Sequence, residues 1–100
     1  INTNQITGTL STSVGNLQEL NVLQVENNFF TGNVPTDSLL ILEKLVALTL
    51  ENNDLTGTVE PLCDLIDGRR VDNNFTVYLT FLYADCLEPA EIECSCCTCF

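Results

Sequence analysis

The residues of this 100-residue chain most able to do chemistry are six cysteines, all in its C-terminal part. They are Cys63, Cys86, Cys94, Cys96, Cys97 and Cys99. An even number of cysteines crowded at one end, in a sequence without histidine, is typical of a disulfide cap in an oxidising compartment. The neighbours Cys96 and Cys97 are expected to bond to different partners. The alternative is a thiolate metal cluster, which the spacing Cys-x-Cys-Cys-x-Cys also suits. We favour disulfides and expect neither a metal nor another cofactor.

Other catalytic groups are scarce in this sequence. It has no histidine, no nucleophile beside a base at a recognised spacing and no glycine-rich phosphate loop, so we do not expect an enzyme. The formal net charge of −11, from 14 acidic and 3 basic residues, argues against nucleic acid, whose phosphates require lysine and arginine. It also disfavours anionic membranes, and no apolar run is long enough for direct membrane insertion. A cationic partner, divalent cations or simple solubility remain compatible with this charge.

A phrase repeated three times identifies the elements that must position these groups. The pattern Asn-x-apolar-Thr-Gly occupies residues 4–8, 28–32 and 53–57. Before the second and third copies runs an apolar ladder with steps of three, three and two residues: Leu17, Leu20, Leu23, Val25 and then Leu42, Leu45, Leu48, Leu50. A period of about 25 residues with this spacing is the signature of a leucine-rich repeat.

Each ladder predicts a turn followed by a short strand. The last two apolar members of each ladder alternate with polar residues, so they are expected to face the core. The asparagines that follow, Asn28 and Asn53, lie where the chain turns inward, and their amides can satisfy backbone groups that the turn buries. The glycine that ends each phrase then permits a backbone conformation, or a close approach, that a Cβ would hinder.

Two parts are expected along the chain. The repeats cover 1–61, the first of them truncated, and a C-terminal cap covers 62–100 with an irregular insertion at 62–78 and a cysteine-rich tail. Because the first repeat lacks a polar N-terminal cap, we expect the C-terminal part of a longer protein.

The period breaks in the insertion, where we expect a loop or a short helix. A last strand then covers about 80–85, with Leu79, Leu82 and Ala84 continuing the ladder. In a less favoured register Val77, Leu79 and Phe81 face inward. Asn74 begins the only Asn-x-Ser/Thr sequon of the sequence and is therefore a candidate glycosylation site.

The full pattern Leu-x-x-Leu-x-Leu-x-x-Asn-x-Leu-Thr-Gly-x-Val-Pro resembles the plant-specific class of leucine-rich repeats over roughly residues 2–62. That class occurs in receptor kinase ectodomains, receptor-like proteins and polygalacturonase inhibitors. The tail, with Cys86 and Cys-x-Cys-Cys-x-Cys, is similar to the C-terminal cap of leucine-rich repeat proteins from microalgae such as diatoms. The resemblance implies an α/β fold, a right-handed solenoid with short parallel strands on its concave face and loops and short 3-10 or α turns on its convex face. It also implies an extracellular or cell-surface location.

The residues between the core leucines are expected to form the concave binding face. Aligning the units gives three columns: Val22/Ala47/Phe81, Gln24/Thr49/Tyr83 and Glu26/Glu51/Asp85. The last column is an acidic stripe that suits a cationic group or Ca²⁺, although ordinary solvated carboxylates are the favoured interpretation. Phe81 and Tyr83 add aromatic surface of the type enriched at binding hot spots, unless they pack beneath the insertion.

These observations predict a non-catalytic, extracellular recognition module that binds a protein, peptide or glycan on its concave acidic face. One alternative is the ectodomain of a receptor kinase or a hydrolase inhibitor. Another is a structural protein that interacts with ice or matrix, because polar residues also align as Thr7/Thr31/Thr56 and Thr9/Asn33/Thr58. Their hydroxyls could order water, or the same residues could simply form a second short sheet.

Overall fold

The computed structural model describes residues 5–66, 71–72, 75–76, 79–87 and 91–100. Its elements in chain order are β1 (Thr7–Thr9), η1 (Thr12–Asn16), β2 (Val22–Gln24), β3 (Phe29–Asn33), α1 (Thr36–Leu40), β4 (Ala47–Thr49), β5 (Asp54–Thr58), η2 (Glu60–Leu62), α2 (Cys63–Ile66), β6 (Val71–Asp72), β7 (Phe75–Thr76), β8 (Phe81–Ala84), β9 (Ile92–Glu93) and β10 (Thr98–Cys99). The fold is α/β, with parallel strands in two sheets and only short helices. Within the described ranges, no helix is long and apolar enough to span a bilayer.

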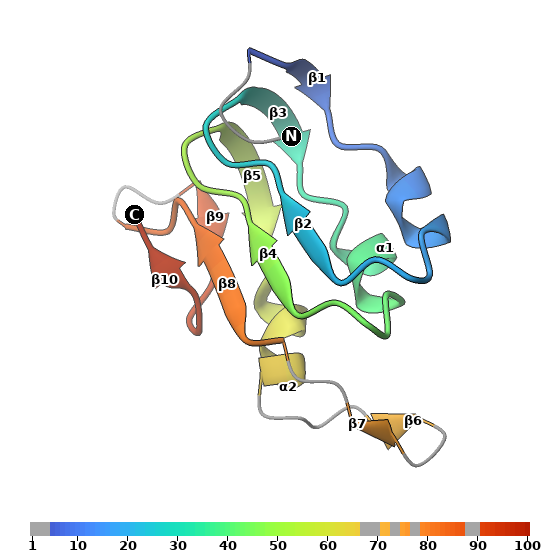
Figure 1. Cartoon of the computed structure of the whole chain (residues 1–100). Coiled ribbons are helices and arrows are strands. Elements are labelled where there is room, and N and C mark those ends of the chain that lie inside the picture. The colour runs from blue at the N-terminus through green and yellow to red at the C-terminus, as the bar shows by residue number, and fades with distance from the viewer. Residues whose placement is uncertain (1–4, 67–70, 73–74, 77–78, 88–90) are drawn as a thin grey trace.

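Two four-stranded sheets enclose the core (Figure 1). One has the order β1-β3-β5-β9 and the other the order β2-β4-β8-β10, and every neighbouring pair is parallel. Apart from the hairpin β6–β7, successive strands of the chain alternate between the two sheets. Each repeat therefore adds one strand to each sheet.

Apart from Phe30 the core between the sheets is aliphatic, and the predicted ladder supplies half of its described residues. Leu48, Leu50 and Val25 are fully buried. In β8, Leu82 and Ala84 are buried while Phe81 is 47% exposed. The favoured register of the last strand is thus confirmed and the competing register, with Phe81 inward, is wrong. The insertion contains the expected short helix, α2, and also the hairpin β6–β7, which the sequence did not predict.

Asn28 and Asn53 bond to the backbone of the turns, as predicted. The Asn53 side chain donates its Nδ2–H to the Val25 carbonyl at 2.9 Å, and its Oδ1 accepts the Phe30 N–H at 3.0 Å. Asn28 Oδ1 accepts the N–H of Ile6 at 3.3 Å in the same way. Each amide therefore joins its own turn to the preceding repeat.

The glycine of the repeated phrase lies where the backbone needs it. Gly32 and Gly57 have φ angles of +82° and +102°, which L-residues with a Cβ rarely adopt. A Cβ added to Gly32 would also lie 3.1 Å from Thr9 Cγ2 on the neighbouring strand. The prediction of an unusual conformation or a close approach is confirmed, and at Gly32 both apply.

The predicted threonine and asparagine columns are wrong. Thr9, not Thr7, lies opposite Thr31, and Asn33 lies opposite Thr56. Strands of this sheet are staggered by two residues relative to the repeat alignment. Buried Phe30 therefore lies opposite Gly8, the glycine of the preceding repeat. It does not lie opposite the apolar residue that occupies its own position in that repeat, Ile6.

The hydroxyls of this sheet are also engaged within the protein. Thr56 donates to Asn33 Oδ1 at 2.9 Å, and Thr58 donates to Glu93 Oε1 at 2.8 Å. Among the described strands, the regular hydroxyl ladder on which the ice-binding alternative depends is therefore missing.

Three disulfides close the C-terminal end of the molecule. Cys63–Cys96 joins α2 to the tail, Cys86–Cys99 joins the chain after β8 to β10, and Cys94–Cys97 lies within the tail. The neighbours Cys96 and Cys97 bond to different partners, as predicted. Four of these half-buried cysteines pack against the hydrophobic core, so the tail covers the core beside the last repeat.

We expect Asn53→Ala to lower the free energy of unfolding by about 2 kcal/mol, because it removes the acceptor of the Phe30 N–H and one of the two side-chain donors to the Val25 carbonyl, which keeps the donor from Asn28. Urea denaturation followed by circular dichroism measures the change. Asn21→Ala, at an exposed asparagine before β2, is the control and should change stability little. Equal losses in the two variants would contradict a bridging role for the Asn53 amide.

Replacing both cysteines of one disulfide at a time should show how much each disulfide contributes to the free energy of unfolding. The contribution is expected to increase with the length of chain that the disulfide closes. Cys63 and Cys96 are 33 residues apart, whereas Cys94 and Cys97 are 3 apart. By loop-closure entropy, Cys63→Ser/Cys96→Ser is expected to lower the free energy of unfolding by about 4 kcal/mol, and Cys94→Ser/Cys97→Ser by about 2 kcal/mol. Denaturant midpoints in the reverse order would contradict the idea that Cys63–Cys96 holds the cap closed.

Candidate functional site

The candidate binding face is the outer face of the sheet formed by β2, β4 and β8. Strand pairing sets Val22 opposite Ala47 and Ala47 opposite Phe81; it also sets Gln24 opposite Thr49 and Thr49 opposite Tyr83. The Asn27 N–H donates to the Glu51 carbonyl at 3.1 Å, which continues the pairing of β2 with β4 to the acidic positions. The strands thus carry the residues in three adjacent columns, as their alignment predicts.

The first column is apolar and open to solvent at both ends. Val22 is 45% exposed and Phe81 is 47% exposed, with half-buried Ala47 between them. Phe81 is therefore not packed beneath the insertion. The Phe81 ring meets Tyr83 edge-on, with centroids 6.2 Å apart and an interplanar angle of 82°.

A third ring, Phe100, extends this aromatic surface, and the sequence did not indicate it. Its centroid lies 5.5 Å from that of Tyr83, and its side chain is 52% exposed. The Phe100 N–H donates to the Ala84 carbonyl at 3.0 Å, directly after β10 pairs with β8. Only the pairing of the tail with β8, a contact between segments far apart in sequence, brings this ring to the site.

The acidic column is less solvated than the sequence suggested. Glu51 is only 9% exposed, and Glu26 and Asp85 are half-buried. These residues follow strand ends, where the chain turns inward, so their carboxylates lie over turns rather than in open water. The favoured interpretation of ordinary solvated carboxylates is therefore wrong for Glu51.

Two carboxylates of this column have partners inside the protein. The Thr49 hydroxyl donates to Glu26 Oε2. The two oxygens of Asp85 accept the N–H groups of Asn52 and Asn53 at 2.9 and 3.2 Å. Asp85 therefore stabilises the turn of the preceding repeat, a structural role in addition to its position on the face.

Glu51 is the exception, because its buried Oε1 has no hydrogen-bond partner among the described residues. Burial raises the pKa of this carboxyl above its usual value. A hydrogen bond from its own backbone lowers the pKa, and the charges of Glu26 and Asp85 raise it further. The ionised form of Glu51 is thus costly until a positive charge or a donor reaches Oε1.

The side-chain carboxylates of the acidic column do not converge on one point. Ca²⁺ requires several oxygens converging on one point. In the described part of the chain, the only group of three or more His, Cys, Asp or Glu side chains with ligand atoms within 4.8 Å of one another is Cys63, Cys94 and Cys96. The predicted glycosylation site, Asn74, lies outside the described residues.

Comparison with known proteins gives a partial similarity. The chain is 38% identical over 55 residues to the protein named Phytosulfokine receptor 1 of Arabidopsis thaliana. The similarity is to a receptor. It covers 55% of this chain but 5% of that protein, so the chain spans about a twentieth of its length. No family model matches the chain, and no solved structure matches it.

Replacing Glu51 and Asp85 by their amides should have opposite effects on stability. Because the folded-state pKa of Glu51 is raised, its stabilising contribution is complete below the unfolded pKa, near pH 4, and is lost as the pH rises through the folded pKa. Glu51→Gln is therefore expected to stabilise the protein at pH 7 by about 1 kcal/mol and to change it little at pH 4.

Asp85→Asn is the matched contrast and should destabilise the protein at pH 7 by about 2 kcal/mol, because one of the two backbone N–H groups loses its acceptor. Urea denaturation at pH 4 and pH 7 measures both effects. A Glu51→Gln variant less stable than the parent at pH 7 would contradict the costly charge at this position.

Proposed function

We propose that this chain is part of a leucine-rich repeat solenoid that acts as a receptor-like, non-catalytic recognition module. Its binding surface is the outer face of β2, β4 and β8, the concave face of the solenoid. The observation that carries the proposal is the alignment of an apolar column and of the column that contains Tyr83 on one sheet face, with the acidic column directly beyond the strand ends. The similarity to a protein named as a receptor supports the same role.

An apolar cavity beside β2 supports the solenoid itself. It has a volume of about 360 Å³ and its lining includes Leu10, Val14, Leu17, Leu23 and Val25. Among the described strands, β2 is an edge strand that pairs only with β4. A further repeat stacked on this edge would extend both sheets and fill the cavity, which is how each repeat of a solenoid covers the next.

The partner that fits this surface best is a protein or peptide segment with cationic and aromatic or aliphatic side chains. The rings of Phe81, Tyr83 and Phe100 offer an anchor of the kind enriched at hot spots. The acidic column lies beside them, in a chain of net charge −11 that attracts cations from a distance. A lysine or arginine reaching Glu51 would give the unpartnered Oε1 a donor. A neutral glycan has no positive charge to pair with the Glu51 carboxylate.

The setting we propose is extracellular, as a secreted protein or an ectodomain. Three disulfides persist only in an oxidising compartment. The receptor similarity favours an ectodomain over a hydrolase inhibitor as the parent protein.

The binding proposal can be tested by panning a phage-displayed random peptide library against the immobilised chain. Enriched peptides are expected to contain lysine or arginine together with aromatic or aliphatic residues. Tyr83→Ala and Glu51→Gln should each weaken their binding at least about 10-fold, the equivalent of 1.4 kcal/mol. Because Glu51→Gln is expected to stabilise the fold, unfolding cannot account for its loss of binding.

Two matched variants lie away from the face and should bind like the parent. Phe29→Ala removes a ring that is 53% exposed on the other sheet. Glu19→Gln removes a carboxylate whose side chain is 85% exposed and paired with Lys44. If the enriched peptides lost affinity for these controls and not for the Tyr83 and Glu51 variants, the proposed face would be wrong.

A further inference from the structure

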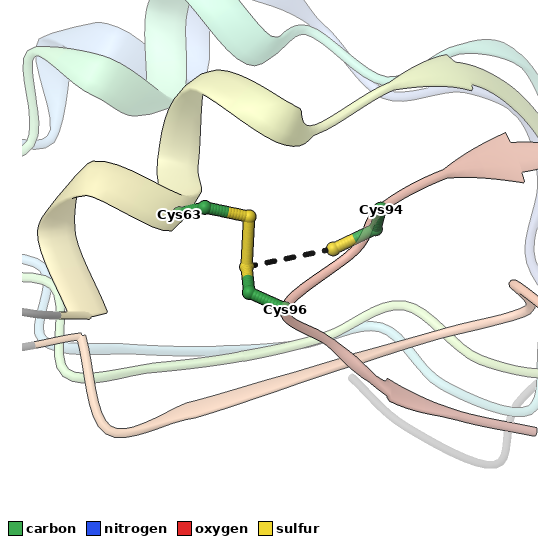
Figure 2. A group of neighbouring side chains, drawn as sticks. All are labelled: Cys63, Cys94 and Cys96. Carbon is green, nitrogen blue, oxygen red and sulfur yellow. Dashed lines mark hydrogen bonds between the residues drawn. A yellow bond between two sulfur atoms is a disulfide. The ribbon is translucent and has the colours of Figure 1, made fainter.

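Two of the three disulfides lie in contact with each other. Cys94 Sγ is 3.8 Å from Cys96 Sγ, although the two sulfurs belong to different disulfides. The sulfurs of Cys63, Cys94 and Cys96 all lie within 4.8 Å of one another, and all three residues are half-buried (Figure 2). Cys63 comes from α2 and the other two from the tail, so the fold itself, and not a short sequence motif, gathers this group.

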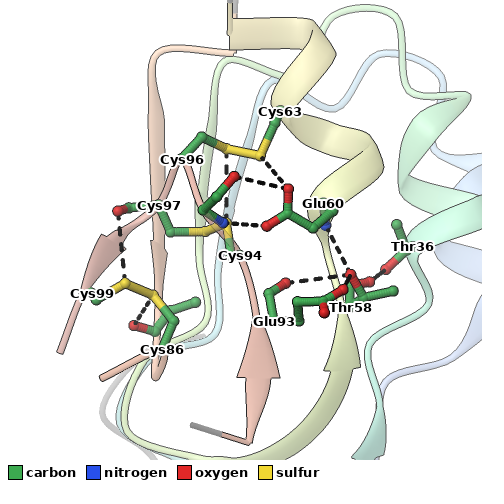
Figure 3. The surroundings of a disulfide bond; sticks show 12 residues. Thr36, Thr58, Glu60, Cys63, Cys86, Glu93, Cys94, Cys96, Cys97 and Cys99 are labelled. Carbon is green, nitrogen blue, oxygen red and sulfur yellow. Dashed lines mark hydrogen bonds between the residues drawn. A yellow bond between two sulfur atoms is a disulfide. The ribbon is translucent and has the colours of Figure 1, made fainter. Parts of the chain in front are cut away.

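A carboxylate stands beside the sulfurs. Glu60 Oε2 lies 3.8 Å from Cys63 Sγ, three residues along the same turn (Figure 3). The carboxylate is held in place by Ser95, whose backbone N–H donates to Oε1 and whose hydroxyl donates to Oε2 at 2.9 Å. Donors that orient a carboxylate in this way are what a metal ligand normally receives from its surroundings.

An acidic cavity connects this group to solvent. It has a volume of about 510 Å³, and its lining includes Glu60, Glu91, Glu93, Cys94 and Ser95. Three carboxylates at one opening raise the local concentration of cations. The cavity therefore gives both a small reductant and a metal ion a path to Cys94 and Glu60, and the other two sulfurs lie within 4.8 Å of the Cys94 sulfur.

We propose that, once reduced, this end of the molecule binds one Zn²⁺ through the thiolates of Cys63, Cys94 and Cys96, with the carboxylate of Glu60 as the fourth ligand. Each of the disulfides Cys63–Cys96 and Cys94–Cys97 gains two electrons and two protons, so four thiols form. For each disulfide, two molecules of a thiol reductant supply them and become a disulfide, or one phosphine and one water supply them and become the phosphine oxide. Zn²⁺ then replaces the protons of three of the four protein thiols, so three protons are released. Three sulfurs and one oxygen are a donor set that tetrahedral Zn²⁺ accepts.

The metal would replace the Cys63–Cys96 disulfide, the one of the three that spans the longest stretch of chain, in joining α2 to the tail. In the oxidised protein, Cys63–Cys96 ties α2 to the tail across 33 residues. Zn²⁺ held by Cys63, Cys94 and Cys96 would join the same two segments. The cap would then remain closed in both oxidation states.

The test is a Co²⁺ titration of the complete chain after reduction with a phosphine under argon. One Co²⁺ per chain is expected to give the sulfur-to-cobalt charge-transfer band and the visible bands of tetrahedral cobalt, and stoichiometric Zn²⁺ should remove both. The reduced chain should also unfold at a higher temperature with Zn²⁺ than without it. Absence of tetrahedral bands, or an unfolding temperature that does not rise with Zn²⁺, would overturn the proposal.

Variants distinguish this site from a chelate made by the tail alone, which would use Cys94, Cys96, Cys97 and Cys99. Cys63→Ser and Glu60→Gln are expected to weaken Co²⁺ binding, and Ser95→Ala to weaken it roughly 10-fold by freeing the carboxylate. Cys99→Ser, the matched control, should bind as the parent does. Loss of binding in Cys99→Ser with normal binding in Glu60→Gln and Cys63→Ser would show a local chelate and overturn the proposal. Glu60→Gln retains all six cysteines, so its result does not depend on a cysteine variant folding.

Discussion

The hydrogen bonds of the repeat asparagines are the interaction on which the rest of the structure depends. A chain that passes from one sheet to the other buries backbone groups that no strand can pair. Asn53 supplies a donor to Val25 and an acceptor to Phe30, both in the preceding repeat. An unmatched buried group costs about 1 to 3 kcal/mol, so these bonds strongly favour one stacking distance between repeats. With the turns fixed, the strands before them are brought into register and the surface columns follow.

In the C-terminal cap, a carboxylate takes the place of the repeat asparagine as the hydrogen-bond partner of backbone groups in a turn. Asp85 reaches back to the N–H groups of Asn52 and Asn53 at 2.9 and 3.2 Å, so a carboxylate supports the last turn where a further repeat would otherwise stack. The tail then adds β9 to one sheet and β10 to the other, beside β5 and β8. An edge strand left open would invite pairing with another chain. Both strands have only two residues, and a disulfide begins in or directly after each of them, from Cys99 in β10 and from Cys94 after β9.

Features set by a repeating local pattern could be predicted from the sequence, and features set by contacts between repeats could not. The ladder identified the inward positions of β4 and β8, because the alternation of apolar residues along one strand can be read from that strand alone. Its first member, Leu17, is exposed. The stagger that places Thr9 opposite Thr31 also places Phe30 opposite Gly8 of the preceding repeat. This contact between two repeats cannot be read from the sequence of one repeat. Phe100 joins Tyr83 only through the pairing of β10 with β8. The disulfide pairing likewise follows from how the tail folds back.

The burial of Glu51 belongs to this second class and separates structural from functional acids. Glu26 accepts a hydrogen bond from Thr49, and Asp85 accepts two from the backbone, so both have a task in the fold. Glu51 Oε1 is buried without a partner in the part of the chain that the structure describes, and burial raises the pKa of this carboxyl, with the charges of Glu26 and Asp85 raising it further. Glutamine has the same shape and would avoid that charge, so the scaffold alone does not explain a carboxylate here. A cationic side chain from a partner would favour the ionised form, so binding would release a proton and strengthen as the pH rises through the pKa of Glu51. Within the acidic column, Glu51 is therefore the residue whose chemistry depends most on a ligand.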